Sequence, residues 1–180
     1  EGVYTLPGVF LRHEAAAMAT ALDRVFGGSA PGDASIRSQE GTVYAARNVL
    51  RLWPDVATVW RRRPLTDCLA AVLGPAFGLV RVLFFDKPPR QTWALPWHKD
   101  LTVAVRDNRR PGAHFSKPTR KAGVAHAEAP LSVLERMLTA RIHLDDVTDE
   151  NGPLKVIPGS HKSGKELTLG DAPPRVLHAT

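Results

Sequence analysis

The sequence predicts an α+β fold, with helices over most of the first 77 residues and short β-strands from residue 78 onward. The first part holds alanine- and leucine-rich stretches whose apolar residues recur at helical spacing. The second part holds β-branched and aromatic runs between turn residues. Helices followed by a run of strands are typical of an α+β chain rather than of alternating βαβ units. A chain of 180 residues suits one domain.

The strongest helix prediction covers residues 12–26. Its alanines favour a helix, and Met18, Leu22 and Phe26 recur along one side of it. Gly27 follows the last apolar residue, as expected at a helix end.

The next segments predict a loop, a strand and two helices. We expect a polar loop to about Glu40 and a strand over residues 42–50. Residues 54–62 and 65–73 predict two short helices with prolines in their first turns, and Gly74 ends the second helix.

Short strands are predicted after residue 78, where β-branched and aromatic residues cluster. They cover residues 78–85, 101–105, 138–144 and 154–157. Residues 106–130 hold prolines, glycines and charges with little periodicity, so we expect a long loop there. Long loops inside compact domains tend to carry function.

Composition limits the partners of the chain. Lys and Arg number 24 against 18 Asp and Glu, giving a formal net charge of +6. The positive residues are scattered, so we expect no nucleic-acid partner, and no apolar run is long enough to predict a membrane partner. The charge hints instead at an anionic small-molecule substrate. The single cysteine, Cys68, favours a reducing, cytoplasmic location.

The sharpest local pattern is Trp97-His98-Lys99-Asp100. Side chains at i and i+2 of an extended segment point to the same side, so His98 and Asp100 project together and Lys99 points away. An imidazole nitrogen and a carboxylate oxygen on one side can be two ligands of a first-row metal. With a distant second histidine they form the facial triad of non-haem iron(II) oxygenases. The alternative is an ordinary surface pair at the start of a strand.

Two longer segments place this pattern in a wider context. One runs from Asp86 to Trp97, and the other from Leu144 to His161, where it includes Glu150-Asn151-Gly152 and Pro158-Gly159-Ser160-His161. Together they resemble the phytanoyl-CoA dioxygenase family of iron(II)- and 2-oxoglutarate-dependent oxygenases, most of all its bacterial members of unassigned substrate. The likeness runs from about Arg47 to His161.

The resemblance implies an all-β core with flanking helices, in which the core is a double-stranded β-helix, a cupin-like jelly roll. Residues 1–180 would be one domain, with a mainly helical part at 1–77. The jelly roll would occupy 78–180 and lack its last strands.

The resemblance also implies a reaction. Iron(II), 2-oxoglutarate and O2 would be used to hydroxylate a small molecule with release of succinate and CO2. His98 and Asp100 would be metal ligands. Related halogenases replace this carboxylate with a small residue, so Asp100 disfavours halogenation.

The third metal ligand is expected outside the sequence. In the family a second histidine lies on a late strand, and an arginine further along pairs the far carboxylate of 2-oxoglutarate. The segment Pro174 to Thr180 is more like the strand before that one, so we expect both residues after position 180. His178 is an alternative ligand. His161 is another candidate, although a structural role in its turn is the interpretation that we favour.

Arg141 is a candidate for binding a carboxylate. The predicted strand 138–144 alternates apolar and polar residues, and the polar side of a small barrel covered by helices should line its cavity. Arg141 could then pair a carboxylate of 2-oxoglutarate or of the substrate. The alternative is a buried ion pair with Asp145 or Asp146.

Weaker candidates surround the metal motif. Thr102 shares the side of His98 and Asp100, so we expect it near the cosubstrate. Arg47 resembles a position at the cosubstrate end of the family's pocket. Trp93 and Gln91 precede the motif and are candidates for substrate contact, although aromatic packing would equally explain Trp93.

Two other function classes stay open at this point. A cosubstrate-independent cupin-type metalloenzyme would use the same fold, but such enzymes usually carry a histidine-rich triad. A catalytically inactive, metal-free binding module on the same fold would explain an incomplete triad.

Overall fold

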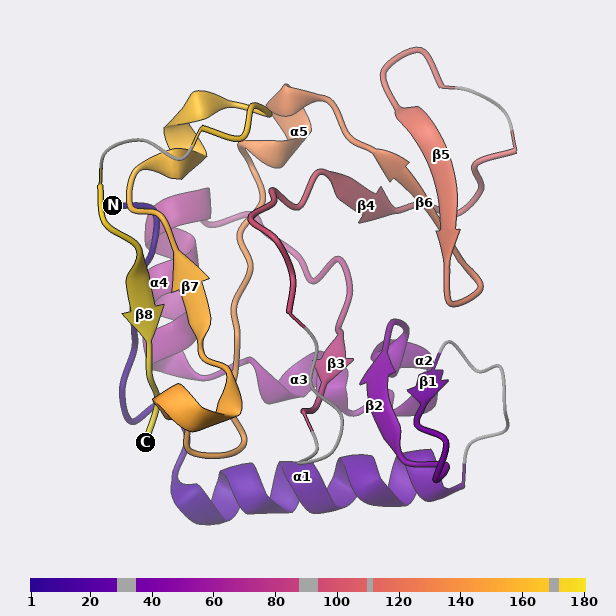
Figure 1. Cartoon of the computed structure of the whole chain (residues 1–180), viewed down its shortest axis with the longest axis vertical. Coiled ribbons are helices and arrows are strands. Elements are labelled where there is room, and N and C mark those ends of the chain that lie inside the picture. The colour runs from indigo at the N-terminus through magenta and orange to yellow at the C-terminus, as the bar shows by residue number, and fades with distance from the viewer. Residues whose placement is uncertain (29–34, 88–93, 110–111, 169–171) are drawn as a thin grey trace.

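The computed structural model of the chain describes residues 1–28, 35–87, 94–109, 112–168 and 172–180. Helices and three small antiparallel sheets alternate along these residues, as Figure 1 shows. The mixed α+β class predicted from the sequence is therefore confirmed. The jelly roll stays a prediction, because the strands described here are short and divided among separate sheets.

Helix α1 (Arg12–Gly27) confirms the helix predicted over residues 12–26. The carboxylate of Glu14 accepts a hydrogen bond from the backbone N–H of Leu11 (2.9 Å) and so satisfies one of the free donors at the helix start. At the other end the N–H of Gly28 donates to the carbonyl of Arg24 (3.2 Å). The buried side chains of this helix are Leu22 and Phe26.

The first sheet consists of β1 (Ser35–Arg37), β2 (Val43–Ala46) and β3 (Phe84–Phe85), in that order. Three predictions are corrected here. Strand β1 lies within the expected polar loop. The strand predicted over 42–50 ends at Ala46, because α2 (Val49–Leu52) begins three residues later. The strand predicted over 78–85 pairs only at Phe84 and Phe85, since β2, its partner, is short.

Two helices follow as predicted, with shifted bounds. Helix α3 covers Val56–Val59 and α4 covers Arg63–Leu73. Pro64 lies in the first turn of α4, where its missing N–H costs nothing. Gly74 ends α4 with a φ of 84°, a value that glycine adopts without steric cost.

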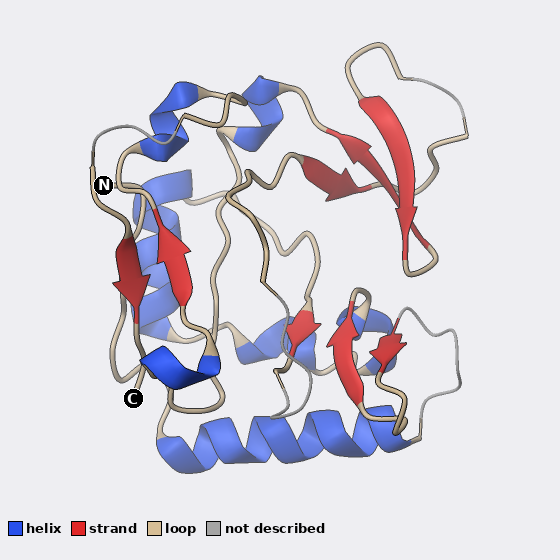
Figure 2. Ribbon diagram, viewed as in Figure 1, coloured by secondary structure: helices blue, strands red, loops and turns tan. Residues whose placement is uncertain are grey.

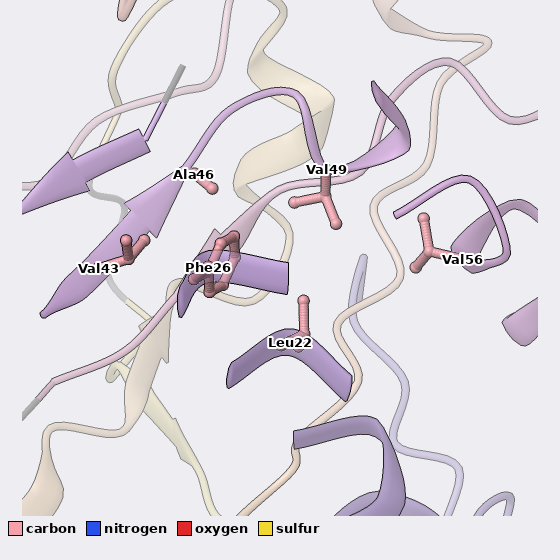
Figure 3. Close-up of a cluster of buried hydrophobic side chains, with 6 residues drawn as sticks. All are labelled: Leu22, Phe26, Val43, Ala46, Val49 and Val56. Carbon is pink, nitrogen blue, oxygen red and sulfur yellow. The ribbon is translucent and has the colours of Figure 1, made fainter. Parts of the chain in front are cut away.

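The main hydrophobic cluster joins α1 to the first sheet, as Figure 3 shows. The rings of Phe26 and Phe84 lie 4.9 Å apart between centroids, so the helix packs directly on β3. Six buried residues form the cluster: Leu22, Phe26, Val43, Ala46, Val49 and Val56. The six buried residues of this cluster therefore all precede the metal motif.

The second sheet corrects the predicted long loop at 106–130. Strands β4 (Thr102–Ala104), β6 (Val124–Glu128) and β5 (Ser116–Lys121) form it, in the spatial order β4-β6-β5 (Figure 2). Ala122 and Gly123 have φ values of 46° and 78°, which give the two-residue turn that suits a β-hairpin. The sequence pattern did not predict β6, because after Val124 its residues are Ala, His, Ala and Glu rather than β-branched or aromatic ones.

The last part of the chain holds α5 (Leu131–Leu134), η1 (Asp149–Asn151), η2 (Ser160–Ser163) and a two-stranded sheet. That sheet pairs β7 (Leu154–Val156) with β8 (Arg175–Leu177), so the strand predicted at 154–157 is confirmed.

The strand predicted at 138–144 is wrong. These residues pair with no strand in the described part of the chain, so an alternating pattern alone did not make a strand. No helix in the described ranges combines the length and apolar character of a membrane span.

Candidate functional site

The metal motif leads directly into β4. The N–H of Ala129, just after β6, donates to the carbonyl of Leu101 (3.0 Å), just before β4. Hydrogen bonding between these two segments therefore begins one residue before β4. Within the strands Thr102 lies opposite Glu128, and Ala104 lies opposite His126. Residues opposite each other in an antiparallel pair share a face of the sheet. Thr102 and His126 therefore lie on the same face.

His98 presents one nitrogen for a ligand. Its Nδ1 lies 2.8 Å from the carbonyl oxygen of Pro96, and a carbonyl only accepts, so Nδ1 carries the proton. With the proton on Nδ1, the ring offers Nε2 to a ligand, and the described residues provide no hydrogen-bond donor to that nitrogen. A backbone carbonyl that fixes the tautomer in this way is a common feature of metal-binding histidines.

The side chain of Lys99 connects the metal motif to the η2 turn. Its Nζ donates to the carbonyl of Ser160 (2.8 Å), the hydroxyl of Ser163 (2.8 Å) and the carbonyl of Gly164 (2.7 Å). All three donors of the ammonium are therefore used. The two motifs that stood out in the sequence, one around His98 and one ending at His161, are physically joined by this side chain.

Arg47, Arg81 and Lys121 influence one another electrostatically, and we call them the cationic cluster. Burial lowers the pKa of Arg81 and of Lys121, the charge of Asp100 raises both, and the charge of Arg47 lowers both. The Nζ of Lys121 donates to the hydroxyl of Thr102 (2.8 Å). In the described ranges no carboxylate lies within ion-pair distance of the cluster.

His126 holds Arg81 in place. Its ring is fully buried and its Nδ1–H donates to the carbonyl of Val124 (2.9 Å). The Nε2 therefore accepts from Nη1 of Arg81, at 2.7 Å. Arg81 precedes β3 and His126 lies on β6, so this hydrogen bond joins the segment before β3 to the second sheet. Figure 1 shows where β3 and β6 lie.

The charge state of His126 gives a pH-dependence prediction. Burial lowers the pKa of the imidazole, and the nearby cations lower it further. Below about pH 6.5 the unfolded chain therefore binds a proton that the folded chain excludes, and stability falls as the pH drops. We expect His126→Gln, which keeps an acceptor for Arg81, to be less acid-sensitive between about pH 6.5 and 5.

The measurement is urea denaturation of both forms across this pH range. The comparison uses the slope of unfolding free energy against pH, because the absolute stability of a buried variant also changes. Parallel slopes for the two forms would contradict a neutral His126 in the folded chain.

Comparison with known proteins settles the family. The model of the phytanoyl-CoA dioxygenase (PhyH) family matches residues 1–176. The chain belongs to this family. Searches of curated proteins and of solved structures give no match.

Membership in the phytanoyl-CoA dioxygenase family indicates an oxidoreductase with a cupin-like fold, and its members generally use iron(II) and 2-oxoglutarate. The donors of His98 and Asp100 are of the type that iron(II) takes in such enzymes. Among the described residues no three His, Cys, Asp or Glu side chains gather closely enough to hold a metal ion. The chain thus offers two fitting donors, and a third is not among the described groups.

The structure separates the alternative third ligands from this pair. His178 hydrogen-bonds to Asp149, with 2.8 Å between Nε2 and Oδ1. His161 lies in the η2 turn beside Gly159, which has a φ of 82°, as the structural interpretation of this turn expects. Its ring packs so closely against Gly2 that a Cβ there would overlap it.

The predicted cosubstrate residues divide into two groups. Thr102 accepts a hydrogen bond from Lys121 of the cationic cluster, and Arg47 is a member of that cluster. Arg141 lies in residues 138–144, which do not form the predicted strand. Burial lowers the pKa of its guanidinium, and its charge lowers the pKa of His143, which burial already depresses. Its alternative partners do not pair with it, since no carboxylate in the described part contacts Arg141. Trp93 and Gln91 lie outside the described residues.

Sequence reasoning missed Arg81, Lys121 and His126. Lys121 and His126 fell in the segment interpreted as a loop, and Arg81 was one residue of an apolar predicted strand. A usable signal was the Lys-Ala-Gly-Val stretch at 121–124, because a glycine between two alternating runs favours a hairpin. That hairpin would have placed Lys121 and His126 on one face.

Proposed function

We propose that the protein is an iron(II)- and 2-oxoglutarate-dependent dioxygenase that hydroxylates a small-molecule substrate and releases succinate and CO2. Family membership supports the reaction class. The observation that carries the residue assignment is the fixed tautomer of His98, two residues from Asp100. In this proposal His98 Nε2 and the Asp100 carboxylate hold the iron, which supplies the oxidising power when O2 reacts with 2-oxoglutarate.

The other residues of the chain have positioning roles in this proposal. Pro96 keeps the proton on Nδ1 of His98, so that Nε2 stays available throughout turnover. Lys99 fixes the motif against η2. Thr102, Arg47 and Arg141 are the proposed cosubstrate residues, and Trp93 and Gln91 the proposed substrate contacts. The family resemblance implies a second histidine as the third ligand, and the described residues bring no third potential ligand to this pair.

Phytanoyl-CoA is not part of this proposal. The family name describes one substrate of one activity, and the residues described here give no acyl-CoA site. The metal-free binding module stays the second candidate, because no three potential metal ligands gather among the described residues.

An anaerobic titration tests the proposal. Iron(II) followed by 2-oxoglutarate is added to the full-length protein, and the weak visible metal-to-ligand charge-transfer band is recorded. We expect a band that requires both additions, together with succinate formation after O2 is admitted. A folded, full-length protein that gives neither the band nor succinate would exclude the oxygenase and favour the metal-free module. A band from iron(II) without 2-oxoglutarate would favour the cosubstrate-independent enzyme.

A further inference from the structure

We propose that Arg81 and Lys121 bind an anionic group of the substrate that is oxidised, so that the substrate is a small organic carboxylate or phosphate, while Arg47 keeps the cosubstrate role proposed above. This inference rests on the proposed function and names the substrate class for that site. It concerns residues that neither the family motifs nor the sequence patterns assign.

The three cations come from different parts of the fold. Arg47 follows β2, Arg81 precedes β3 and Lys121 ends β5. Each is only partly exposed, and burial lowers the pKa of both Arg81 and Lys121. Bringing like charges together while removing them from water costs free energy unless an anion compensates.

The positive charge of the cluster is only partly neutralised by carboxylates of the described residues. The anion acting on Arg81 and Lys121 is Asp100, and no ion pair to the cluster occurs in the described ranges. The neighbouring sheet residue Glu128 contrasts with this, since its carboxylate pairs both Lys117 (2.7 Å) and Lys165 (2.8 Å). Cations with a structural role on this sheet are therefore paired, whereas the cluster is not.

Arg81 and Lys121 are each held by a hydrogen bond and have further N–H donors. Arg81 uses Nη1 on His126, and a guanidinium has five N–H donors. Lys121 uses one of its three donors on Thr102. His126, Thr102 and Lys121 share one face of the β4-β6-β5 sheet, because Lys121 lies opposite Val124 on β6. The remaining donors of Arg81 and Lys121 leave hydrogen-bonding capacity for an oxyanion.

Charge balance favours the substrate over the cosubstrate. The cluster and Asp100 together carry two net positive charges. Iron(II) and the 2-oxoglutarate dianion cancel each other in formal charge, so those two charges persist after both have bound. An anionic substrate supplies the missing negative charge and lies next to the metal ligand.

The first arm of the test measures anion binding directly, without metal. Inorganic phosphate and propionate are titrated calorimetrically into metal-free, full-length protein, into Arg81→Met and into Lys121→Met. Arg120→Met is the matched control, because Arg120 neighbours Lys121 in β5 and donates to the carbonyl of Gly123 on the exposed side. We expect each cluster variant to bind at least one of the anions about tenfold more weakly and the control to match the wild type. Wild-type protein that binds neither anion at millimolar concentration, or variants that bind both equally well, would overturn the proposal.

The second arm separates substrate from cosubstrate. The Kd of 2-oxoglutarate is measured anaerobically from the charge-transfer band of the iron(II) protein in the same variants. We expect it to stay within about twofold of the wild-type value. A tenfold rise would assign the cluster to 2-oxoglutarate and overturn the substrate assignment. If the wild-type protein lacks the band but binds the anions through Arg81 and Lys121, the proposed oxygenase function is contradicted and the anion site is not. Arg81→Lys, which keeps the charge, should restore part of the binding if the fold is intact.

Discussion

Replacing Asp100 with alanine is expected to remove the charge-transfer band and to lower succinate formation by more than about 100-fold. Loss of a residue that merely orients a metal ligand costs about 10–100-fold in affinity or activity, and loss of a ligand itself should cost more. The same result is expected for His98→Ala, since no other described side chain near it can replace the imidazole. Both effects are measured by anaerobic titration with iron(II) and 2-oxoglutarate and by succinate release.

Stability separates this loss of function from misfolding. His98 and Asp100 are exposed, so thermal denaturation of both variants should differ little from the wild type. Asp55→Ala and His114→Ala serve as controls, because both side chains are exposed and neither belongs to the motif or to the cationic cluster. Retention of the band and of succinate formation in folded Asp100→Ala would show that this carboxylate is not a ligand.

Replacing Phe26 with alanine is expected to destabilise the fold by about 3–5 kcal/mol. Its ring is 5% exposed and packs on Phe84, so truncation leaves a cavity between α1 and the first sheet. Because Arg81 lies three residues before Phe84, we also expect this variant to loosen the Arg81–His126 contact. Urea denaturation measures the unfolding free energy.

The control for Phe26→Ala lies on another helix. Val72 of α4 is 62% exposed, so Val72→Ala should change the unfolding free energy by less than about 0.5 kcal/mol. A loss below about 1 kcal/mol in Phe26→Ala, with the denaturant dependence unchanged, would mean that the cluster in Figure 3 does not hold α1 on the sheet.

Local signals explain which elements could be predicted. The helix at 12–26 and the turn at Gly74 depend on residues close in sequence, and both are correct. The hairpin 116–128 depends on a turn whose first residue, Ala122, adopts a left-handed conformation that alanine rarely takes. The segment 138–144 shows the opposite error, since an alternating pattern needs a neighbouring strand before it forms a ladder.

The candidate site divides in the same way. His98 and Asp100 could be found because their spacing in an extended segment is itself the signal. Arg81 and His126 are 45 residues apart and meet through the arrangement of two sheets, so no spacing reveals them. The residues that set the charge around the proposed metal site could therefore be identified only from the folded structure.

The three hydrogen bonds of Lys99 secure one end of the metal motif. Their partners lie 61 to 65 residues further along, and pairing between β4 and β6 secures the other end of the motif. With both ends anchored, His98 and Asp100 are held between η2 and the second sheet. Their position therefore depends on contacts far along the chain, and a change engineered in η2 would reach the proposed metal-binding pair through Lys99.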